Sequence, residues 1–337
     1  MTTTQALLGC YTTDGAPGLR AVRVHATGVI EPLGALAMES PSCVVWHPTL
    51  PIAYATNETL SGGVTAVAVD VTGEMTVVGA ASTGAAPCHA AVTRDGQWLL
   101  TADYLGATVT LVALEPEGRP SATVDTLTLH GTGPHPARQD APHPHMIAAD
   151  VAGEALVCVD LGTDRLTSLT ISGDGRLQEK GSWRLPPGTG PRQVVTAPDG
   201  ETALVVGELS ATLLHVRLGA SGDAVVLAEV PTTASSETTW PAQIAITADG
   251  GHALVSNRGP DTLAFFDLRS GTLDRVAEVP AGVRWPRHFT LAGAHLLVAG
   301  EQSDTIVSYE LGGADLIGGF TSRFSTPAPT WVALGPS

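Results

Sequence analysis

The stretch PRQVVTAPDGETALVVGE, residues 191–208, contains two short apolar runs separated by a polar turn. A proline opens the first run, the dipeptide Asp199-Gly200 lies between the runs, and Glu208 closes the second run. Runs rich in Val, Leu and Thr on either side of an Asp-Gly pair are typical of antiparallel β-strands joined by a tight turn. The recurrence of this two-stranded unit decides the fold.

The same unit occurs six times along the chain. The copies are PSCVVWHPTLPIAYATNE (41–58), PCHAAVTRDGQWLLTADY (87–104), PHMIAADVAGEALVCVDL (144–161), the copy at 191–208, PAQIAITADGGHALVSNR (241–258) and PRHFTLAGAHLLVAGEQ (286–302). The steps between their first prolines are 46, 57, 47, 50 and 45 residues. A period of about 40 to 50 residues with β signals indicates the blades of a β-propeller.

The two ends of the chain supply a seventh blade. Pro329 lies 43 residues after Pro286 and is followed by a single apolar run, while LLGCYTTDGAPGLRAVRV (7–24) has the pattern of the later strands of a blade. We therefore predict an all-β, seven-bladed β-propeller of four-stranded antiparallel blades. Residues 1–337 form one domain in this prediction, and the last blade combines about 325–337 with 1–30. Closing the ring in this way removes exposed sheet edges.

Composition and charge narrow the classes of partner. The 33 acidic and 17 basic side chains give a net charge of −16, which argues against a nucleic-acid partner and against an anionic membrane surface. No apolar run reaches the roughly 18 residues of a membrane span, and the start MTTTQALLGC lacks the features of a signal peptide. The scattered cysteines predict reduced thiols and a cytoplasmic location; they are Cys10, Cys43, Cys88 and Cys158.

Antiparallel pairing predicts where the polar residues of the repeat meet. The start of one strand lies beside the end of the next, so the residue after each proline shares one mouth of the ring with the residues that close the second strand. The post-proline residues are Ser42, Cys88, His145, Arg192, Ala242, Arg287 and Thr330. The closing residues are Asn57-Glu58, Asp103-Tyr104, Asp160, Glu208, Asn257-Arg258 and Glu301-Gln302. We expect a polar funnel there, the kind of convergent mouth in which ligands bind.

The longer step before Pro144 inserts about ten residues that end at the same mouth. This segment carries His130, His135, Arg138, Asp140, His143 and His145. A metal at the His-Pro-His spacing is an alternative, but further ligands at a recognisable spacing are missing from the sequence, and we predict neither a metal nor a cofactor. Four aspartates are expected to bind turn backbone groups rather than to act in chemistry: Asp103, Asp160, Asp164 and Asp261.

Several segments resemble the seven-bladed propeller lactonases, and the similarity extends over all seven blades. The segments are ARQDAPHPHMIAAD, VCVDLGTDRL, GTGPRQVVTAPDG, VVGELSATL, ALVSNRGPDTLAFF and WPRHFTLAG with LLVAGEQSDTIVSYEL. The resemblance implies catalytic residues at the channel mouth: His143 or His145 of the PHxH motif, Arg192 of GPR, Glu208 of GEL and Arg258 of SNRG. We further predict that the substrate is bound by Arg138, Gln193, Gln243, Asn257, Arg287 and His288.

The principal functional hypothesis is a metal-independent lactonase for a sugar-type lactone such as 6-phosphogluconolactone. A His with a pKa near neutrality serves as acid and base, Glu208 orients this His or activates water, and Arg192 and Arg258 stabilise the oxyanion or bind a carboxylate or phosphate. Three positions differ from the usual family pattern and leave the substrate open: Gln193 replaces His, Gln243 replaces Glu, and Gly207 replaces Asn.

Two other functions fit the same residues. The first is a cycloisomerase, or a specialised biosynthetic cyclase, in which arginines hold substrate carboxylates while His or Glu moves a proton. The second is a non-enzymatic propeller that serves as a binding platform, since propellers carry many functions. In the enzymatic hypotheses the partner is a small molecule, a lactone or a carboxylate, and the protein is a monomer or a small homo-oligomer.

Overall fold

Each proline-led unit forms the two inner strands of a blade. The unit at 191–208 gives β16 (Pro191–Thr196) and β17 (Ala203–Gly207), which pair in antiparallel fashion. In six of the seven blades the proline is the first residue of the inner strand, where its missing N–H removes no ladder hydrogen bond. The proline spacing therefore marks the innermost strand around the ring.

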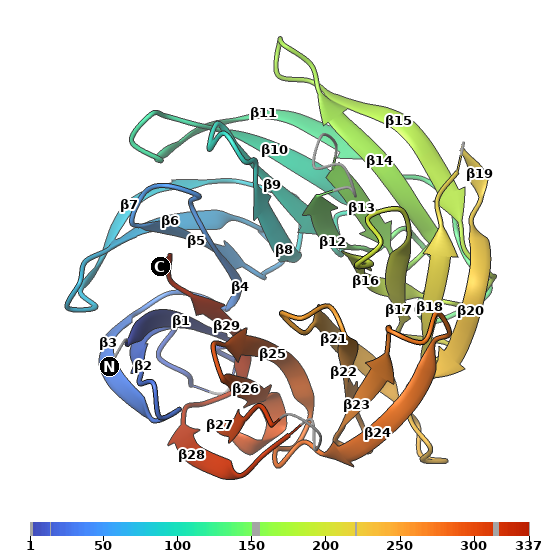
Figure 1. Cartoon of the computed structure of the whole chain (residues 1–337). Helices are drawn as coiled ribbons and strands as arrows, with labels where there is room; N and C mark the ends of the chain where they lie inside the picture. Colours follow the sequence, from blue (N-terminus) through green and yellow to red (C-terminus); the bar gives the residue numbers. More distant parts are fainter. Residues whose placement is uncertain (1–2, 14, 150–155, 220, 313–316, 337) are drawn as a thin grey trace.

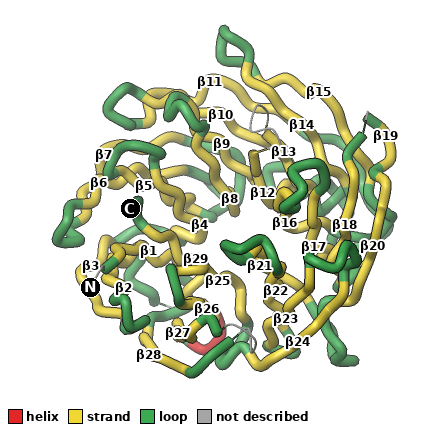
Figure 2. Tube along the Cα trace, viewed as in Figure 1, coloured by secondary structure: helices red, strands yellow, loops and turns green. Residues whose placement is uncertain are grey.

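The structure is a computed structural model that describes residues 3–13, 15–149, 156–219, 221–312 and 317–336. These residues form seven sheets arranged as blades around an axis (Figure 1), and nearly all of the chain is strand or loop (Figure 2). This arrangement confirms the predicted all-β, seven-bladed β-propeller. One 3-10 helix, η1 (Glu301–Ser303), occurs in the described residues, and none of their helical segments is long and apolar enough to cross a bilayer.

The strands follow one another from the inside of each blade to its outside. The first two blades in chain order contain β4 (Pro41–Trp46), β5 (Ile52–Asn57), β6 (Val64–Val69) and β7 (Met75–Ala81), and β8 (Pro87–Val92), β9 (Trp98–Asp103), β10 (Thr108–Leu114) and β11 (Pro120–Thr128). The third blade contains β12 (Pro144–Ala149), β13 (Leu156–Asp160), β14 (Arg165–Ile171) and β15 (Leu177–Arg184). The fourth blade contains β16, β17, β18 (Thr212–Arg217) and β20 (Val225–Pro231). The next two contain β21 (Trp240–Ile246), β22 (His252–Arg258), β23 (Thr262–Asp267) and β24 (Asp274–Pro280), and β25 (Pro286–Ala292), β26 (His295–Gly300), β27 (Thr305–Glu310) and β28 (Phe320–Ser325).

The seventh blade joins the two ends of the fold, as predicted. Its strand order is β29 (Pro329–Leu334), β1 (Thr4–Cys10), β2 (Leu19–Val24) and β3 (Ile30–Leu36). β29 and β1 pair in antiparallel fashion with Leu8 opposite Val332, and Figure 1 shows the two strands side by side. The ring therefore closes through main-chain hydrogen bonds between the first and the last strand.

One sheet contains a fifth strand, which the repeat did not predict. β19 (Gly222–Asp223) lies between β18 and β20 in the chain and pairs in parallel with Trp183 and Arg184 of β15, in the neighbouring blade. The Trp183 indole N–H also donates to the Gly219 carbonyl at 2.9 Å. Such a segment covers the outer edge of the β15 blade, an edge that would otherwise leave main-chain groups unpaired.

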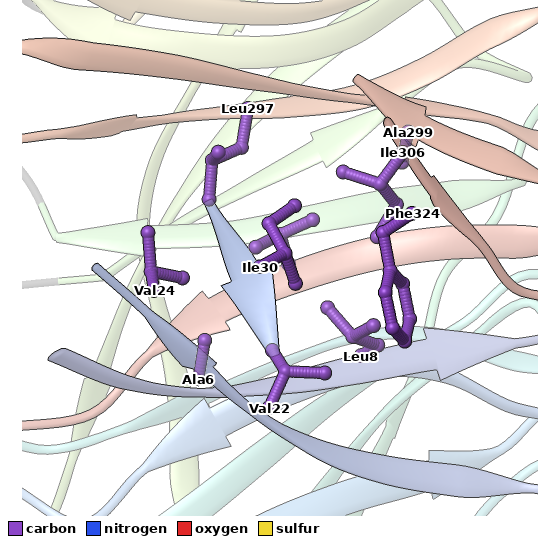
Figure 3. Close-up of a cluster of buried hydrophobic side chains, with 10 residues drawn as sticks. Ala6, Leu8, Val22, Val24, Ile30, Leu297, Ala299, Ile306 and Phe324 are labelled. Atoms are coloured by element: carbon purple, nitrogen blue, oxygen red, sulfur yellow. The ribbon is translucent and has the colours of Figure 1, made fainter. Parts of the chain in front are cut away.

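Apolar side chains of facing sheets form the core. Seven buried clusters are found among the described residues, and each lies between two neighbouring blades. The cluster in Figure 3 joins Leu8 and Val22 of the seventh blade to Leu297, Ile306 and Phe324 of the sixth. Burial of this surface favours folding by roughly 25 cal/mol per Å², so the interfaces between blades stabilise the ring.

Aspartates link consecutive blades at the mouth where the inner strands begin. Asp164 accepts a hydrogen bond from the Gly190 N–H at 2.7 Å, and Asp261 accepts one from the Trp285 N–H at 2.8 Å. Both donors precede the proline of the next blade and have a left-handed backbone, with φ of 55° at Gly190 and 58° at Trp285. These contacts confirm the expected turn role of both aspartates, and they fix the entry of the next inner strand.

Candidate active site

A β-bulge in the inner strand turns the post-proline side chains toward the mouth of the ring. In β12, Pro144 pairs with Asp160 and Met146 with Val159, so His145 has no partner across the ladder. The same register shift leaves Arg192 in β16 and Arg287 in β25 without a partner across the ladder. A bulged residue changes the direction of its side chain, which is why bulges recur beside active sites.

The residues that close the second strands lie beside the bulged residues at the same mouth of the ring. The N–H of Glu208 donates to the carbonyl of Gly190 at 2.8 Å, and that of Glu58 donates to the carbonyl of Ser40 at 3.0 Å. The two sets surround a cavity of about 410 Å³. Its lining residues are Glu58, Cys88, Tyr104, Arg138, His145, Arg192, Glu208, Trp240, Arg258, Trp285 and Arg287.

Three arginines converge on Glu208. Its Oε1 accepts a hydrogen bond from Arg138 at 2.6 Å, and its Oε2 accepts one from Arg192 at 2.8 Å and one from Arg258 at 2.7 Å. The Glu208 side chain is only 2% exposed. Burial alone would raise the pKa of this carboxyl, but the charges of Arg258 and Arg192 hold the pKa well below its usual range. Glu208 is therefore ionised and fixes the guanidinium groups in place.

The structure separates the two histidines that flank Pro144. His145 lines the cavity, and its Nε2 accepts a hydrogen bond from Arg192 at 2.5 Å, which places the ring proton on Nδ1. Burial, followed by the Arg192 charge, lowers the pKa of His145 well below its ordinary value. His143 instead stacks on the Tyr104 ring with 4.4 Å between centroids and donates from Nδ1 to the Tyr104 carbonyl at 2.9 Å. His143 therefore supports the wall and does not line the cavity.

A second polar cluster lies at the Arg287 side of the cavity. Arg287 donates to the Tyr11 hydroxyl at 2.5 Å, and this hydroxyl donates to Glu58 Oε1 at 3.0 Å. The other end of the Arg287 guanidinium lies 3.4 Å from Glu301 Oε2. This cluster thus places a second carboxyl group, Glu58, in the same cavity as Glu208.

Two tryptophans form the aromatic part of the wall. The Trp240 and Trp285 rings lie 5.4 Å apart at an interplanar angle of 49°. Arg258 contacts both, because its Nε donates to the Trp240 carbonyl at 3.0 Å and its guanidinium lies 5.6 Å from the Trp285 ring centroid. An aromatic face beside a charged group can pack against the apolar face of a ring compound.

The other predicted substrate-binding residues lie outside the lining of this cavity. Gln193 donates from its amide to Gln243 Oε1 at 2.8 Å, so these two residues bind each other beside the central axis. Asn257 donates to the Thr232 carbonyl at 2.8 Å, and the His288 ring lies 4.0 Å from that of Trp331. Of that predicted set, only Arg138 and Arg287 line the cavity.

Several lining residues had a weaker signal in the sequence. Glu58, Tyr104 and Cys88 were placed at the mouth by the repeat but received no role. Trp240 and Trp285 were missed, although each directly precedes the proline of its blade in a Trp-Pro dipeptide. Comparing the residue before each proline would have found both tryptophans.

No group of three His, Cys, Asp or Glu side chains in the described part of the chain is arranged to hold a metal ion. Of the two aspartates at strand ends, Asp160 binds turn backbone groups as expected, whereas Asp103 binds threonine hydroxyls of its own blade instead. Asp103 accepts hydrogen bonds from the hydroxyls of Thr101 and Thr110 at 2.7 and 2.6 Å. Asp160 accepts from the N–H groups of His143 and Gly162 at 2.7 and 3.0 Å.

Two buried histidines below the cavity make stability depend on pH. Burial lowers the pKa of His89 to about 4 and that of His288 to about 3. Both pKa values lie below that of an unfolded His, so the unfolded chain binds protons first and stability is lost as the pH falls from 6.5 toward these values. Moving from pH 7.5 to 5.0 is expected to lower the free energy of unfolding by about 2 kcal/mol for each histidine.

This pH dependence is checked by urea unfolding at both pH values. The wild type is compared with a double variant that carries His89→Asn and His288→Asn. Asn keeps an acceptor for the Ile147 and Val332 N–H groups that the two imidazoles bind. The double variant should lose about 4 kcal/mol less than the wild type on acidification. The exposed His130→Asn serves as control. Equal losses in wild type and double variant would contradict the prediction.

The similarity of this chain to known proteins extends over nearly its whole length. Residues 5–334 match the model of the family described as "Lactonase, 7-bladed beta-propeller". The chain is 30% identical over 316 residues to a 6-phosphogluconolactonase of Bacillus subtilis, covering 90% of each chain. A solved structure from Bacteroides fragilis superposes with a TM-score of 0.92 at 25% identity, covering 99% of this chain and 98% of that one. A periplasmic gluconolactonase of Pseudomonas aeruginosa shares the fold, with a TM-score of 0.91 at 22% identity and 99% coverage of both chains.

Proposed function

The chain belongs to the seven-bladed β-propeller lactonase family, and we propose that this enzyme hydrolyses the ring ester of an anionic sugar-type lactone such as 6-phosphogluconolactone. The charge of the cavity supports this most directly, because four arginines there face two glutamates. An anionic substrate balances the excess positive charge, although the protein as a whole carries −16. The name of the Bacillus subtilis relative supports the same class of substrate.

Arg192 and Arg258 are the proposed oxyanion donors. Each uses part of its guanidinium to hold Glu208, whereas Arg192 Nη2 and Arg258 Nη1 make no hydrogen bond to any other described residue. Preorganised donors of this kind stabilise the tetrahedral intermediate by about 3 to 4 kcal/mol each. Glu208 holds both arginines in place, and neutral His145 also binds Arg192.

Hydrolysis above the spontaneous rate tests this function. The purified protein is mixed with 6-phosphogluconolactone or with glucono-δ-lactone, and acid release is followed with a pH indicator. Faster hydrolysis of the phosphorylated lactone than the spontaneous rate supports the proposal. If the folded protein accelerates neither lactone, the proposal is wrong. The exposed Arg269→Gln variant is the control and should retain full activity.

Arg138 is the proposed contact for the anionic group. It lies at the rim, its side chain is 35% exposed, and it also donates to the Tyr104 hydroxyl at 3.3 Å. Arg138→Gln is expected to raise KM for the phosphorylated lactone about tenfold, because a hydrogen bond to a charged group is worth roughly 1.5 to 3 kcal/mol. The KM for glucono-δ-lactone, measured in parallel, should change less than twofold. An equal rise for both lactones would contradict a role in binding the phosphate.

We also propose that the protein acts in the cytoplasm as one domain, in a monomer or small homo-oligomer, without nucleic-acid or membrane partners. The acidic charge supports the absence of these two partners. All four cysteines are free and buried, which fits a reducing compartment.

A further inference from the structure

The carboxyl group of Glu58 has no role in the scheme above, although it lies in the cavity. Glu58 directly follows β5, and it lines the cavity together with His145, Arg192 and Arg287. Its Oε1 accepts the hydrogen bond from Tyr11. Its Oε2 is withdrawn from solvent and has no hydrogen-bond partner among the described residues. One carboxylate oxygen is therefore held by the protein, and the other stays unsatisfied until a small shift of the side chain brings a ligand or a water to it.

The two residues that the sequence favoured for proton transfer are already engaged. Both oxygens of Glu208 bind guanidinium groups, so protonation of Glu208 would break contacts with Arg138, Arg192 or Arg258. The Nε2 of His145 is occupied by the hydrogen bond from Arg192. The Nδ1 of His145 also has no hydrogen-bond partner, but it carries the ring proton, so Glu58 is the lining carboxyl or imidazole group among the described residues that keeps an unbound basic atom.

Groups from several blades face the Glu58 carboxyl. They are Tyr11 after β1, Ser42 of β4, Cys88 of β8, Arg192 of β16 and Arg287 of β25, with Glu301 behind Arg287. Burial raises the pKa of Glu58 above its ordinary value, and the charge of Arg287 offsets this only in part. The carboxyl can therefore gain and lose a proton closer to neutral pH than an exposed glutamate can.

We infer that Glu58 is the general base and acid of the reaction, and this inference rests on the proposed lactonase function. Water attacks the lactone carbonyl carbon and gives one proton to Glu58 Oε2 while the new C–O bond forms. Arg192 and Arg258 bind the resulting oxyanion. When the intermediate collapses, the bond between the carbonyl carbon and the ring oxygen breaks, and Glu58 returns the proton to that oxygen. The product is an open chain with a carboxylic acid and a hydroxyl group.

Tyr11 and Arg287 are positioning residues in this scheme. The Tyr11 hydroxyl holds Oε1, which leaves Oε2 for the water, and Arg287 holds the hydroxyl. Tyr11→Phe should therefore lower kcat about tenfold and leave KM nearly unchanged. A role in binding only would raise KM instead.

The test compares Glu58→Gln, Glu58→Ala and wild type with the better of the two lactones. We expect kcat of Glu58→Gln to fall about 10²- to 10⁴-fold with KM within threefold of wild type. The wild-type kcat should decrease at low pH as Glu58 becomes protonated, and this decrease should vanish in Glu58→Gln. Formate should restore part of the activity of Glu58→Ala, because it supplies a carboxylate in the vacated space.

Circular dichroism establishes that the variants are folded, and Glu229→Gln on the outer strand β20 is the control for the substitution itself. A folded Glu58→Gln with kcat within threefold of wild type, or a Glu58→Ala that formate does not rescue, would overturn this inference. A wild type that accelerates neither lactone would instead overturn the proposed function, so the two failures are distinguishable.

Discussion

Glu208→Gln is expected to lower kcat/KM for the lactone at least a hundredfold and to destabilise the fold by about 3 to 5 kcal/mol, the usual cost of removing one partner of a buried ion pair. The side chain is 2% exposed and neutralises guanidinium groups from three places in the chain, Arg138, Arg192 and Arg258. A neutral amide leaves these charges facing one another, so their geometry for the oxyanion is lost as well.

Urea unfolding at pH 7.5 and steady-state kinetics measure the two effects. Glu31→Gln is the control, because Glu31 also pairs with an arginine, Arg23 at 3.2 Å, but lies on the outer strand β3 with a side chain that is 47% exposed. It should be nearly as stable as the wild type and keep its activity, since exposed ion pairs contribute little to stability. A Glu208→Gln protein as stable and as active as the control would show that the arginines do not depend on this carboxylate.

The second large effect is expected for Arg192→Lys. Lysine keeps the positive charge but lacks the planar fork of arginine, so it cannot bind the Ala242 carbonyl, His145 and Glu208 together as Arg192 does. We expect kcat to fall about 10²- to 10³-fold, which corresponds to the loss of one oxyanion donor.

Single-turnover and steady-state kinetics of Arg192→Lys separate this loss from weaker binding. The control is Arg165→Lys on β14, where Arg165 contacts the Ser182 hydroxyl at 3.2 Å away from the cavity. If lysine at position 192 retained most of the activity, positive charge alone would be sufficient and the argument from geometry would fail.

The sequence predicted the fold well because the repeat is a property of the backbone. A proline at the start of an inner strand, a turn and a second apolar run are all local features. Their spacing counted the blades and placed Arg192, Glu208 and Arg258 at one mouth. The five-stranded sheet was not predictable in this way, since β19 pairs through only two residues, Gly222 and Asp223.

Side-chain direction explains most of what the sequence left open. His143 and His145 both flank Pro144, and only the bulge in β12 shows which imidazole points into the cavity. Gln193 comes directly after Arg192, yet its side chain turns away from the cavity and binds Gln243. Tyr11 reaches Glu58 because the ring brings β1 beside β4, a contact between blades that no local pattern encodes.

The closing strand also determines when the enzyme reaches full activity during its synthesis. β29 is the last described strand to leave the ribosome, yet it forms the inner strand of the blade that contains β1. The Tyr11 N–H donates to the carbonyl of Ala328, the residue just before β29. Until that strand docks, Tyr11 has no fixed position and Glu58 lacks the hydroxyl that holds Oε1. A nascent chain with six finished blades would therefore bury most of its core and still lack full activity, so full turnover reports completion of the whole ring.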